Sequence, residues 1–369
     1  MATPHSGNQT EEPTRGVKLQ PQGTDGYHEC WYPVCMSREV PRAGVRGFKF
    51  LNGKVIVFRD KNGNVSVLSA FCRHLGVDLS LGKIVDNRIQ CPYHHWEYDG
   101  AGQCVKTSVG DTPPQGAKLH EFPIREHLGL IWAYYGETPA YEVPSLPYPE
   151  EELEYIVNRG TELPMDAYML YSNTMDLQHL ISLHGAEFDQ MPSDFDVADH
   201  TISYTQEMTL PKFGKSVQTI TLHGTNCVSI VSEVNGRMTF LLSAGLTTEG
   251  PLAKTFNVSA TLKRSSKHAT RKGIPLIENL LIKLHLRMIN AFGDKLNADD
   301  DPIFRTMSPR LDNLTASDRA LSIYFNYVKN YPRSSLAEDL ICNDYMAAAQ
   351  RSTRPNIASD SAYITGRSV

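Results

Sequence analysis

Two short segments of the chain each carry one cysteine and one histidine. Cys72 and His74 are separated by one residue, and Cys91 and His94 by two residues. Such short spacing allows one turn to present two ligands, and the longer gap between the segments brings in a second loop. The resulting set of two thiolates and two imidazoles suits either a zinc ion or an iron–sulfur cluster with mixed ligands.

The spacing favours a Rieske-type [2Fe–2S] cluster. Zinc sites of this composition usually pair Cys with Cys and His with His, whereas here each loop offers one of each. A cluster with two Cys on one iron and two His on the other needs such mixed loops. The spacing of two residues after Cys91 selects His94 as the ligand. The adjacent His95 would then face away from the cluster or support the site. Zinc stays the alternative.

A second group of polar residues lies on a segment that is predicted to be helical, from residue 165 to residue 183. It comprises Asn173, Asp176, His179 and His184. Asp176 and His179 are three apart, so they would share a helix face. His184 is five residues beyond His179, and Gly185 predicts that the helix ends there and brings the second imidazole back.

Two histidines and one carboxylate, with other positions left open, form the ligand set of non-haem Fe(II) oxygenases. The best downstream carboxylates are the three consecutive aspartates before Pro302, and the second choice is the acidic pair at 338–339. The sequence thus contains the residues for a mononuclear iron site that is separate from the cluster.

The pattern of elements around these residues indicates an α+β protein. Val55–Phe58 and Val65–Leu68 flank a turn at Asn62 and Gly63, which is a strong hairpin signal. Short strands and Gly-rich loops continue to about residue 136, and a Pro-rich stretch follows. Consecutive strands over residues 202–262 are then followed by helices. Residues 276–292 form an apolar helix with Leu276, Leu280, Leu284 and Met288 on one stripe, usually a core face but here also a possible pocket wall.

Composition excludes several classes of protein. The chain has 369 residues, a net charge of −5 and no long apolar run, which argues against nucleic-acid binding and against membrane spans. Seven cysteines without a secretory signal argue against a disulfide framework. We therefore expect a cytoplasmic protein with neither nucleic acid nor membrane among its partners.

The motifs resemble those of the oxygenase component (α subunit) of the Rieske non-haem iron oxygenases. The matching segments are C-R-H-L-G at 72–76, C-P-Y-H-H-W at 91–96 and N-T-M-D-L-Q-H-L-I-S-L-H at 173–184. The pattern is most similar to the steroid-hydroxylase and aminopyrrolnitrin-oxygenase-like branches. The resemblance implies a small β Rieske domain followed by a catalytic domain with an antiparallel sheet wrapped around helices, of the helix-grip type.

The resemblance also implies roles for individual residues. Cys72 and Cys91 would hold one iron of the cluster, and His74 and His94 the other. His179 and His184 would bind the mononuclear Fe(II), with Asp176 as a bridging acid to a cluster histidine of the next subunit and Asn173 beside it. Asp300 fits the register of the third ligand, while Asp299, Asp301 and Asp339 stay open as alternatives. The subunits would form a head-to-tail homotrimer.

The implied function is that of a terminal oxygenase. Electrons from NAD(P)H would reach the cluster through a ferredoxin or flavin reductase and then pass to the mononuclear iron, where O2 is used. Leu75 and the register of Asp300 favour mono-oxygenation (hydroxylation, demethylation or N-oxidation) of a hydrophobic, cyclic small molecule. The alternatives are an aromatic-ring cis-dihydroxylating dioxygenase and a non-catalytic Rieske or zinc-binding protein.

The expected boundaries are a flexible tail over 1–26, the Rieske domain over 27–138, a linker over 139–150, the catalytic domain over 151–355 and a second tail over 356–369. Pocket walls are expected from parts of residues 202–246 and from the helix at 276–292.

Overall fold

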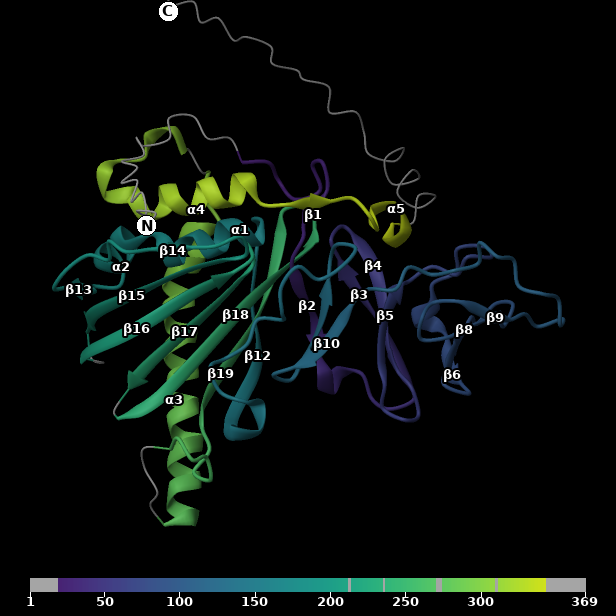
Figure 1. Ribbon diagram of the computed structural model, residues 1–369, viewed down its shortest axis with the longest axis horizontal. Coiled ribbons are helices and arrows are strands. Elements are labelled where there is room, and N and C mark those ends of the chain that lie inside the picture. Colours follow the sequence, from purple (N-terminus) through teal and green to yellow (C-terminus); the bar gives the residue numbers. More distant parts are fainter. Residues whose placement is uncertain (1–18, 212–213, 235, 270–273, 309–310, 343–369) are drawn as a thin grey trace, which may run out of the picture.

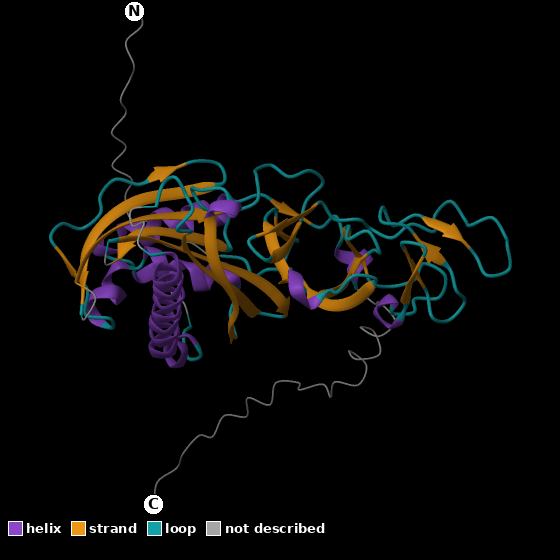
Figure 2. Ribbon diagram, turned by 90° about the horizontal axis from the view of Figure 1, so that it is seen from below, coloured by secondary structure: helices purple, strands orange, loops and turns teal. Residues whose placement is uncertain are grey.

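A computed structural model describes residues 19–211, 214–234, 236–269, 274–308 and 311–342. The chain forms an elongated molecule with small β-sheets at one end and a large curved sheet with helices at the other (Figures 1 and 2). The described part of the chain contains no helix that is long and apolar enough to cross a bilayer. The α+β class expected from the order of elements is confirmed.

The N-terminal part consists of three small antiparallel sheets with the orders β3-β4-β5, β10-β11-β2 and β6-β7-β8-β9. Their strands are β2 (Trp31–Met36), β3 (Gly44–Phe50), β4 (Gly53–Arg59), β5 (Val65–Ser69), β6 (Lys83–Val85), β7 (Arg88–Gln90), β8 (Glu97–Tyr98), β9 (Cys104–Lys106), β10 (Ile124–His127) and β11 (Leu130–Tyr134). Strand β1 (Tyr27–His28) pairs separately with β20 (Arg333–Ser334). The predicted hairpin is confirmed: the side chain of Asp60 accepts hydrogen bonds from the backbone N–H groups of Asn62 and Asn64, and Gly63 has a φ of +102°.

The large sheet has eight antiparallel strands, in the order β12-β19-β18-β17-β16-β15-β13, with β14 beside β15. These strands are β12 (Leu153–Leu163), β13 (Glu187–Phe188), β14 (Asp196–Val197), β15 (Thr201–Leu210), β16 (Gly214–His223), β17 (Cys227–Val234), β18 (Arg237–Glu249) and β19 (Leu252–Leu262). Alternate residues of β15 are buried, as expected for a strand with one face against a core. The sequence Asn235-Gly236 is a second turn signal of the kind seen at Asn62 and Gly63, and it lies between β17 and β18, but Asn235 is outside the described residues.

Helices cover one face of this sheet. They are α1 (Ala167–Tyr171), α2 (Leu177–Ser182), α3 (Pro275–Phe304) and α4 (Arg319–Asn330). After α4 come β20 (Arg333–Ser334) and α5 (Glu338–Ile341), and α5 packs against β4 of the N-terminal part. Short 3-10 turns occur at Ser37–Glu39, Leu79–Leu81, Glu150–Glu152, Ser172–Met175, Leu311–Asn313 and Ala316–Asp318. The long helix α3 crosses the sheet and projects past its edge (Figure 1).

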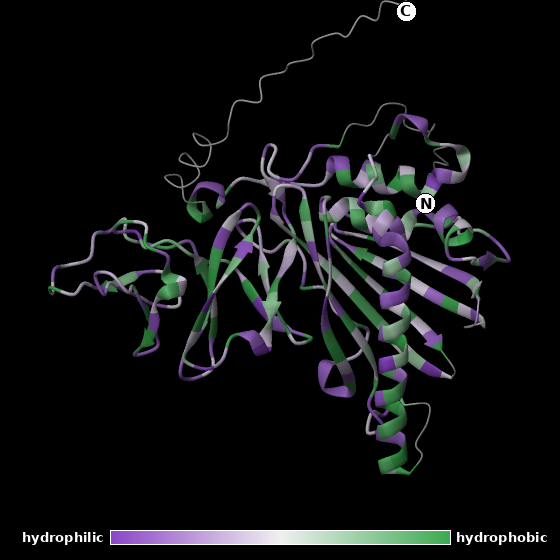
Figure 3. Ribbon diagram, turned by 180° about the vertical axis from the view of Figure 1, so that it is seen from behind, coloured by the Kyte–Doolittle hydropathy of each residue, from purple (hydrophilic) through white to green (hydrophobic). Residues whose placement is uncertain are grey.

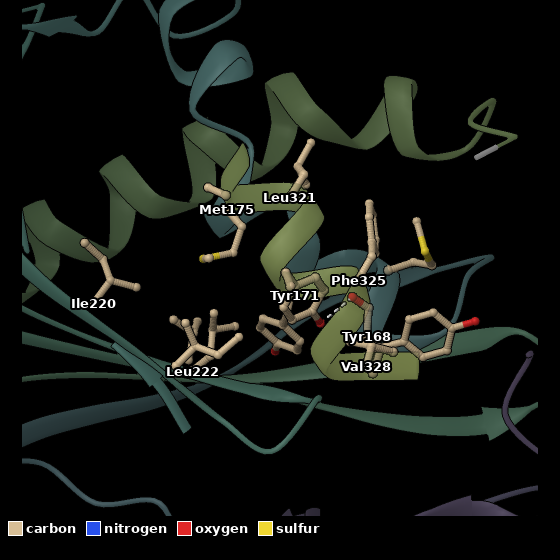
Figure 4. Packing of buried hydrophobic residues seen from close by; sticks show 14 of the residues in the cluster. Tyr168, Tyr171, Met175, Ile220, Leu222, Leu321, Phe325 and Val328 are labelled. Atoms are coloured by element: carbon tan, nitrogen blue, oxygen red, sulfur yellow. Dashed lines mark hydrogen bonds between the residues drawn. The ribbon is translucent and has the colours of Figure 1, made fainter. Parts of the chain in front are cut away.

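One apolar cluster fixes the helices that carry the second polar group. Tyr168 and Tyr171 of α1, together with Met175, pack between strand β16 and helix α4 (Figure 4). From the strand come Ile220 and Leu222, and from the helix come Leu321, Phe325 and Val328. The hydroxyl of Tyr324 on α4 donates a hydrogen bond of 2.7 Å to the carbonyl of Tyr168. This packing fixes the position of the start of α2 relative to the sheet.

The helix that we predicted over residues 165–183 is interrupted. It is divided into α1, a 3-10 turn and α2, and the break lies at Asp176, whose φ and ψ are −90° and 86°. The Asp176 carboxylate accepts a hydrogen bond of 3.1 Å from the backbone N–H of His179, so it caps α2 at its N-terminus. An aspartate competes with helical hydrogen bonding in this way, which explains the break.

The apolar stripe of α3 does not face the core, contrary to our expectation. Leu276, Leu280, Leu284 and Met288 are exposed. The buried face of this half of the helix is instead partly polar: Glu278 pairs with Arg237 of β18, and the ring of His285 lies 2.8 Å from the hydroxyl of Thr239. These polar contacts and the buried Ile282 and Leu286 together fix this side of α3 against the sheet.

Residues 19–26 differ from the flexible tail that we predicted. The backbone N–H of Gln22 donates to the Asp166 carboxylate at 3.0 Å, and the carbonyl of Gln20 accepts from the hydroxyl of Tyr168. Polar residues can therefore be ordered by hydrogen bonds to a folded domain even where they bury little apolar surface. Residues 1–18 and the predicted tail at 356–369 lie outside the described residues.

We expect Asp166→Asn to stabilise the protein at neutral pH. Burial raises the pKa of the Asp166 carboxyl to about 6. The folded state then holds this proton more tightly than the unfolded state, so stability falls as pH rises from about 4 to about 6. The variant avoids this loss and should gain on the order of 1–3 kcal/mol at pH 7 but little at pH 4. Thermal unfolding at both pH values measures the difference, with Asp294→Asn, at an exposed carboxylate, as the control. An equal gain at both pH values would contradict the prediction.

Candidate metal centres

The first centre is formed by two loops of the small sheets. Residues 72–76 follow β5, and residues 91–96 connect β7 to β8. Each loop closes with the same backbone pattern: Gly76 N–H donates to the Cys72 carbonyl at 2.8 Å, and His95 N–H donates to the Cys91 carbonyl at 3.2 Å. Gly76 and His95 both have a left-handed φ, of +72° and +52°. The loops are therefore matched turns that each present one thiol and one imidazole.

The thiols are buried, whereas the imidazoles reach the surface. Cys72 and Cys91 are at most 3% exposed, His74 is exposed and His94 is half-buried. The rings of His74 and His94 lie with their centroids 4.7 Å apart, and Trp96 stacks on His74 at 4.5 Å. His94, rather than His95, thus lies beside the other predicted imidazole ligand.

The two buried thiols lie close enough to share a hydrogen bond. This bond lowers the pKa of the Cys91 thiol and raises the pKa of the Cys72 thiol. The hydroxyl of Tyr98 lies 3.2 Å from the sulfur of Cys72. Two adjacent thiols in the interior and two imidazoles at the surface match the donor set of a Rieske cluster, with Cys on one iron and His on the other. Sequence reasoning missed Trp96 and Tyr98, although Trp96 closes the second motif.

The second centre brings together His179, His184 and Asp300. Their ligand atoms all lie within 4.8 Å of one another. His179 lies on α2, His184 lies just beyond the end of this helix, and Asp300 lies near the C-terminus of α3. The Nε2 atom of His184 is 3.1 Å from a carboxylate oxygen of Asp300, and the two imidazole centroids are 5.3 Å apart.

The end of α2 places His184 as the sequence predicted. Gly185 has a φ of +68°, and its N–H donates to the carbonyl of Ile181. The N–H of Ala186 donates to the carbonyl of Leu180 at 2.9 Å, which closes the helix end. A left-handed backbone conformation favours glycine. Gly185 therefore allows the chain to turn back, so that His184 approaches His179.

The surroundings of the second centre suit a cation. Burial raises the pKa of the Asp300 carboxyl and lowers the pKa of His179. The Nδ1 atom of His184 is buried and has no hydrogen-bond partner among the described residues. Asn173 donates a hydrogen bond of 3.2 Å to the second carboxylate oxygen of Asp300 and so orients it. Two imidazoles and one oriented carboxylate match the donor set of a mononuclear non-haem iron site.

The other predicted carboxylates lie elsewhere. Asp299 is exposed, Asp301 forms an ion pair with Arg305 at 2.6 Å, and Asp339 lies on α5, at the N-terminal domain. Asp176 is half-buried, and its carboxylate is used to cap α2. The ligand roles of His179, His184 and Asp300 and the bridging role of Asp176 stay predictions.

A cavity adjoins the second centre. Its volume is about 160 Å³, and its lining includes Asn173, Asp300 and Phe304. A second cavity of about 160 Å³ continues between the sheet and α3, sharing Val228 and Asn257 with the first. Its walls include Leu241 and Leu242 from the predicted segment 202–246, and Ile289 and Asn290 from the predicted helix 276–292. The predicted pocket walls are therefore partly confirmed.

Comparison with known proteins supports the first centre directly. Residues 30–123 match the Rieske [2Fe–2S] domain. The chain is 30% identical to chlorophyllide a oxygenase, chloroplastic, from Chlamydomonas reinhardtii over 177 residues, which are 47% of this chain and 27% of that protein. It is also 30% identical to the cholesterol 7-desaturase nvd from Bombyx mori over 46% of this chain and 38% of that protein. The chain thus spans well under half the length of these relatives.

Solved structures share the fold over most of the chain. Pseudomonas putida CBB5 NdmA QL mutant with theobromine superposes with a TM-score of 0.65 at 21% identity, over 81% of this chain and 89% of that one. Dicamba monooxygenase bound to dicamba gives a TM-score of 0.59 at 20% identity, over 87% and 98% of the two chains. The chain thus contains a Rieske [2Fe–2S] domain over residues 30–123, and it shares its two-part fold with these solved structures.

Proposed function

We propose that this chain is a terminal oxygenase that mono-oxygenates a hydrophobic, cyclic small molecule. The observation that carries the proposal is the meeting of His179, His184 and Asp300 beside a cavity, in a chain that also has a Rieske domain. When bound, the cluster supplies single electrons and the mononuclear iron supplies the reduction of O2. Hydroxylation, demethylation and N-oxidation all belong to this reaction class.

The residues of the chain position and enclose the reaction. Asn173 orients the Asp300 carboxylate through a hydrogen bond. The left-handed turn at Gly185, just after α2 ends, positions His184. The hydroxyls of Tyr171 and Ser243 lie 3.0 Å apart, and Ser243 donates to the amide oxygen of Asn257 at 2.7 Å. All three of these residues line the cavity, so a fixed polar wall faces the apolar side chains that would hold a hydrophobic substrate.

A head-to-tail homotrimer supplies the electron route in this proposal. The loops of the first centre and helix α2 lie at opposite ends of the chain (Figure 1). A neighbouring copy that places its cluster beside Asp176 and His179 shortens the transfer path, and a closed ring repeats this contact in every subunit. A ferredoxin or a flavin reductase would deliver the electrons from NAD(P)H to the cluster. The cytoplasmic location stays a prediction, and the relative from Chlamydomonas reinhardtii is chloroplastic.

Spectroscopy and elemental analysis test the proposal. Anaerobically purified protein should contain about three irons and two sulfides per chain, and reduction should give the rhombic EPR signal of a His-ligated cluster. Turnover with labelled O2 should place one labelled atom in the product. Two labelled atoms would instead indicate a cis-dihydroxylating dioxygenase, and a colourless protein with zinc would contradict the oxygenase function.

A further inference from the structure

The projecting half of α3 carries an exposed apolar surface that the proposed function does not use. We define the α3 tip as residues 274–288. Leu276 is 82% exposed and Leu280 is 57% exposed. The exposed apolar side chains of the tip are Ile274, Leu276, Ile277, Leu280, Leu281, Leu284 and Met288. Figure 3 shows hydrophobic segments along this end of the helix, beyond the edge of the sheet. A cluster of this kind marks an interaction site.

These side chains form one continuous stripe. At 3.6 residues per turn, the positions from Leu276 to Met288 fall within an arc of about 140°. The opposite side of the helix faces the sheet and carries Glu278, Ile282 and His285, which are all buried. The tip therefore turns one apolar side to solvent. Its other side is fixed to the fold by the buried Ile282 and Leu286 and by the pair between Glu278 and Arg237.

The charges of the tip are complementary to an anionic surface. The exposed charged residues between Ile274 and Gly293 are Lys283 and Arg287, which lie at the border of the apolar arc. The acid of this segment, Glu278, is buried and paired. Lys267, in the loop that precedes α3, is exposed as well. An apolar helix face bordered by cations is the pattern of a helix that lies in the interface of a membrane.

Two protein partners fit this surface less well. A second copy of the chain would bring Lys283 and Arg287 against the same cations of its neighbour, which disfavours association. An acidic electron-transfer partner would match the charge but would be far from the cluster loops, which lie at the other end of the molecule (Figure 1). A lipid surface needs neither self-complementarity nor access to the cluster.

We propose that the α3 tip binds the surface of a bilayer that contains anionic lipids. The apolar arc enters the boundary between headgroups and acyl chains, and Lys283 and Arg287 contact the lipid phosphates. Such peripheral binding requires no spanning helix. It replaces the expectation, drawn from the short apolar runs of the sequence, that the protein has no membrane partner. The proposal does not depend on the proposed oxygenase function.

Flotation of the full-length holoprotein with vesicles tests the proposal. Vesicles of phosphatidylcholine with phosphatidylglycerol should carry the protein, whereas vesicles of phosphatidylcholine alone should carry much less. The double variant Leu280→Asp, Leu284→Asp should abolish binding. Lys283→Glu combined with Arg287→Glu should weaken binding to the anionic vesicles by roughly tenfold or more, because each cation contributes separately. Raised salt should weaken the binding of the unsubstituted protein.

A matched control distinguishes binding through the α3 tip from nonspecific binding of the protein to lipid. Val217→Asp changes a side chain on β16 that is 54% exposed, and it should leave flotation unchanged. Sedimentation velocity and the iron and sulfide contents of each variant verify assembly and folding. Binding that survives the leucine substitutions would overturn the proposal. It would also be overturned if the unsubstituted protein bound neither kind of vesicle. A change of oligomeric state in the leucine variant would then show that the tip is a contact between copies.

Discussion

The His179→Ala variant should lose its mononuclear iron and its turnover but keep its cluster. His179 supplies one of the three ligand atoms that lie within 4.8 Å of one another, and its removal leaves one imidazole and one carboxylate. We expect the iron content to fall from about three to about two per chain, with two sulfides retained. The EPR signal of the reduced cluster should be unchanged, because Cys72, His74, Cys91 and His94 lie in the other domain.

A neighbouring substitution provides the control for this variant. Gln178→Ala changes the exposed residue that precedes His179 on the same helix, and it removes a hydrogen bond to Asp318 on the surface. It tests whether a disturbance of α2 alone releases the metal, and it should keep three irons. Retention of full iron content and turnover in the His179→Ala variant would show that the second centre is misassigned.

The parts of the site that depend on short stretches of chain could be predicted from the sequence. Cys72 and His74 share one turn, as do Cys91 and His94, so their spacing alone determines that each loop offers a thiol and an imidazole. Gly185 likewise marks the end of α2 through its own backbone preference. Such features are local, and the residue types that they require are visible in a sequence.

The remaining features depend on packing between distant segments. Residue type does not distinguish Asp299, Asp300 and Asp301, among which the family resemblance favoured Asp300. The rotation of α3 on the sheet decides that Asp300 faces the two histidines. The buried face that goes with this rotation combines Ile282, Leu286 and Ile289 with polar contacts such as Glu278 with Arg237, and hydrophobic periodicity does not reveal the polar contacts. The same contacts turn the leucine stripe of α3 outward, against the usual rule that an apolar face points to the core.

The Cys72→Ser variant should lose its cluster and its turnover but keep its mononuclear iron. The Cys72 side chain is buried beside Cys91, and a hydroxyl is a poor ligand for an iron–sulfur cluster compared with a thiolate. About two irons and two sulfides per chain should disappear, together with the visible colour. Cys104→Ser is the matched control, because Cys104 is equally buried in the same hydrophobic cluster, on strand β9, but is not a predicted ligand. A Cys104→Ser variant without its cluster would mean that the first loss reflects folding rather than ligation.

Two inactive variants should regain activity when they assemble together. A Cys72→Ser copy keeps the mononuclear iron, and a His179→Ala copy keeps the cluster. In a head-to-tail trimer formed at equal, random mixing, about a quarter of the contacts place an intact cluster beside an intact iron site. Turnover should therefore recover to about a quarter of the unsubstituted level. Co-expressed copies with different affinity tags allow this measurement, with any substrate that the unsubstituted protein accepts.

The outcome of this mixing decides between electron transfer within a chain and transfer between chains. If the cluster served the iron site of its own chain, neither copy would contain a complete pair, and the mixed assembly would stay inactive. The positions of the two centres at opposite ends of the chain favour transfer between copies (Figure 1). Recovery would also agree with the predicted bridging role of the half-buried Asp176, in addition to its observed role as the cap of α2.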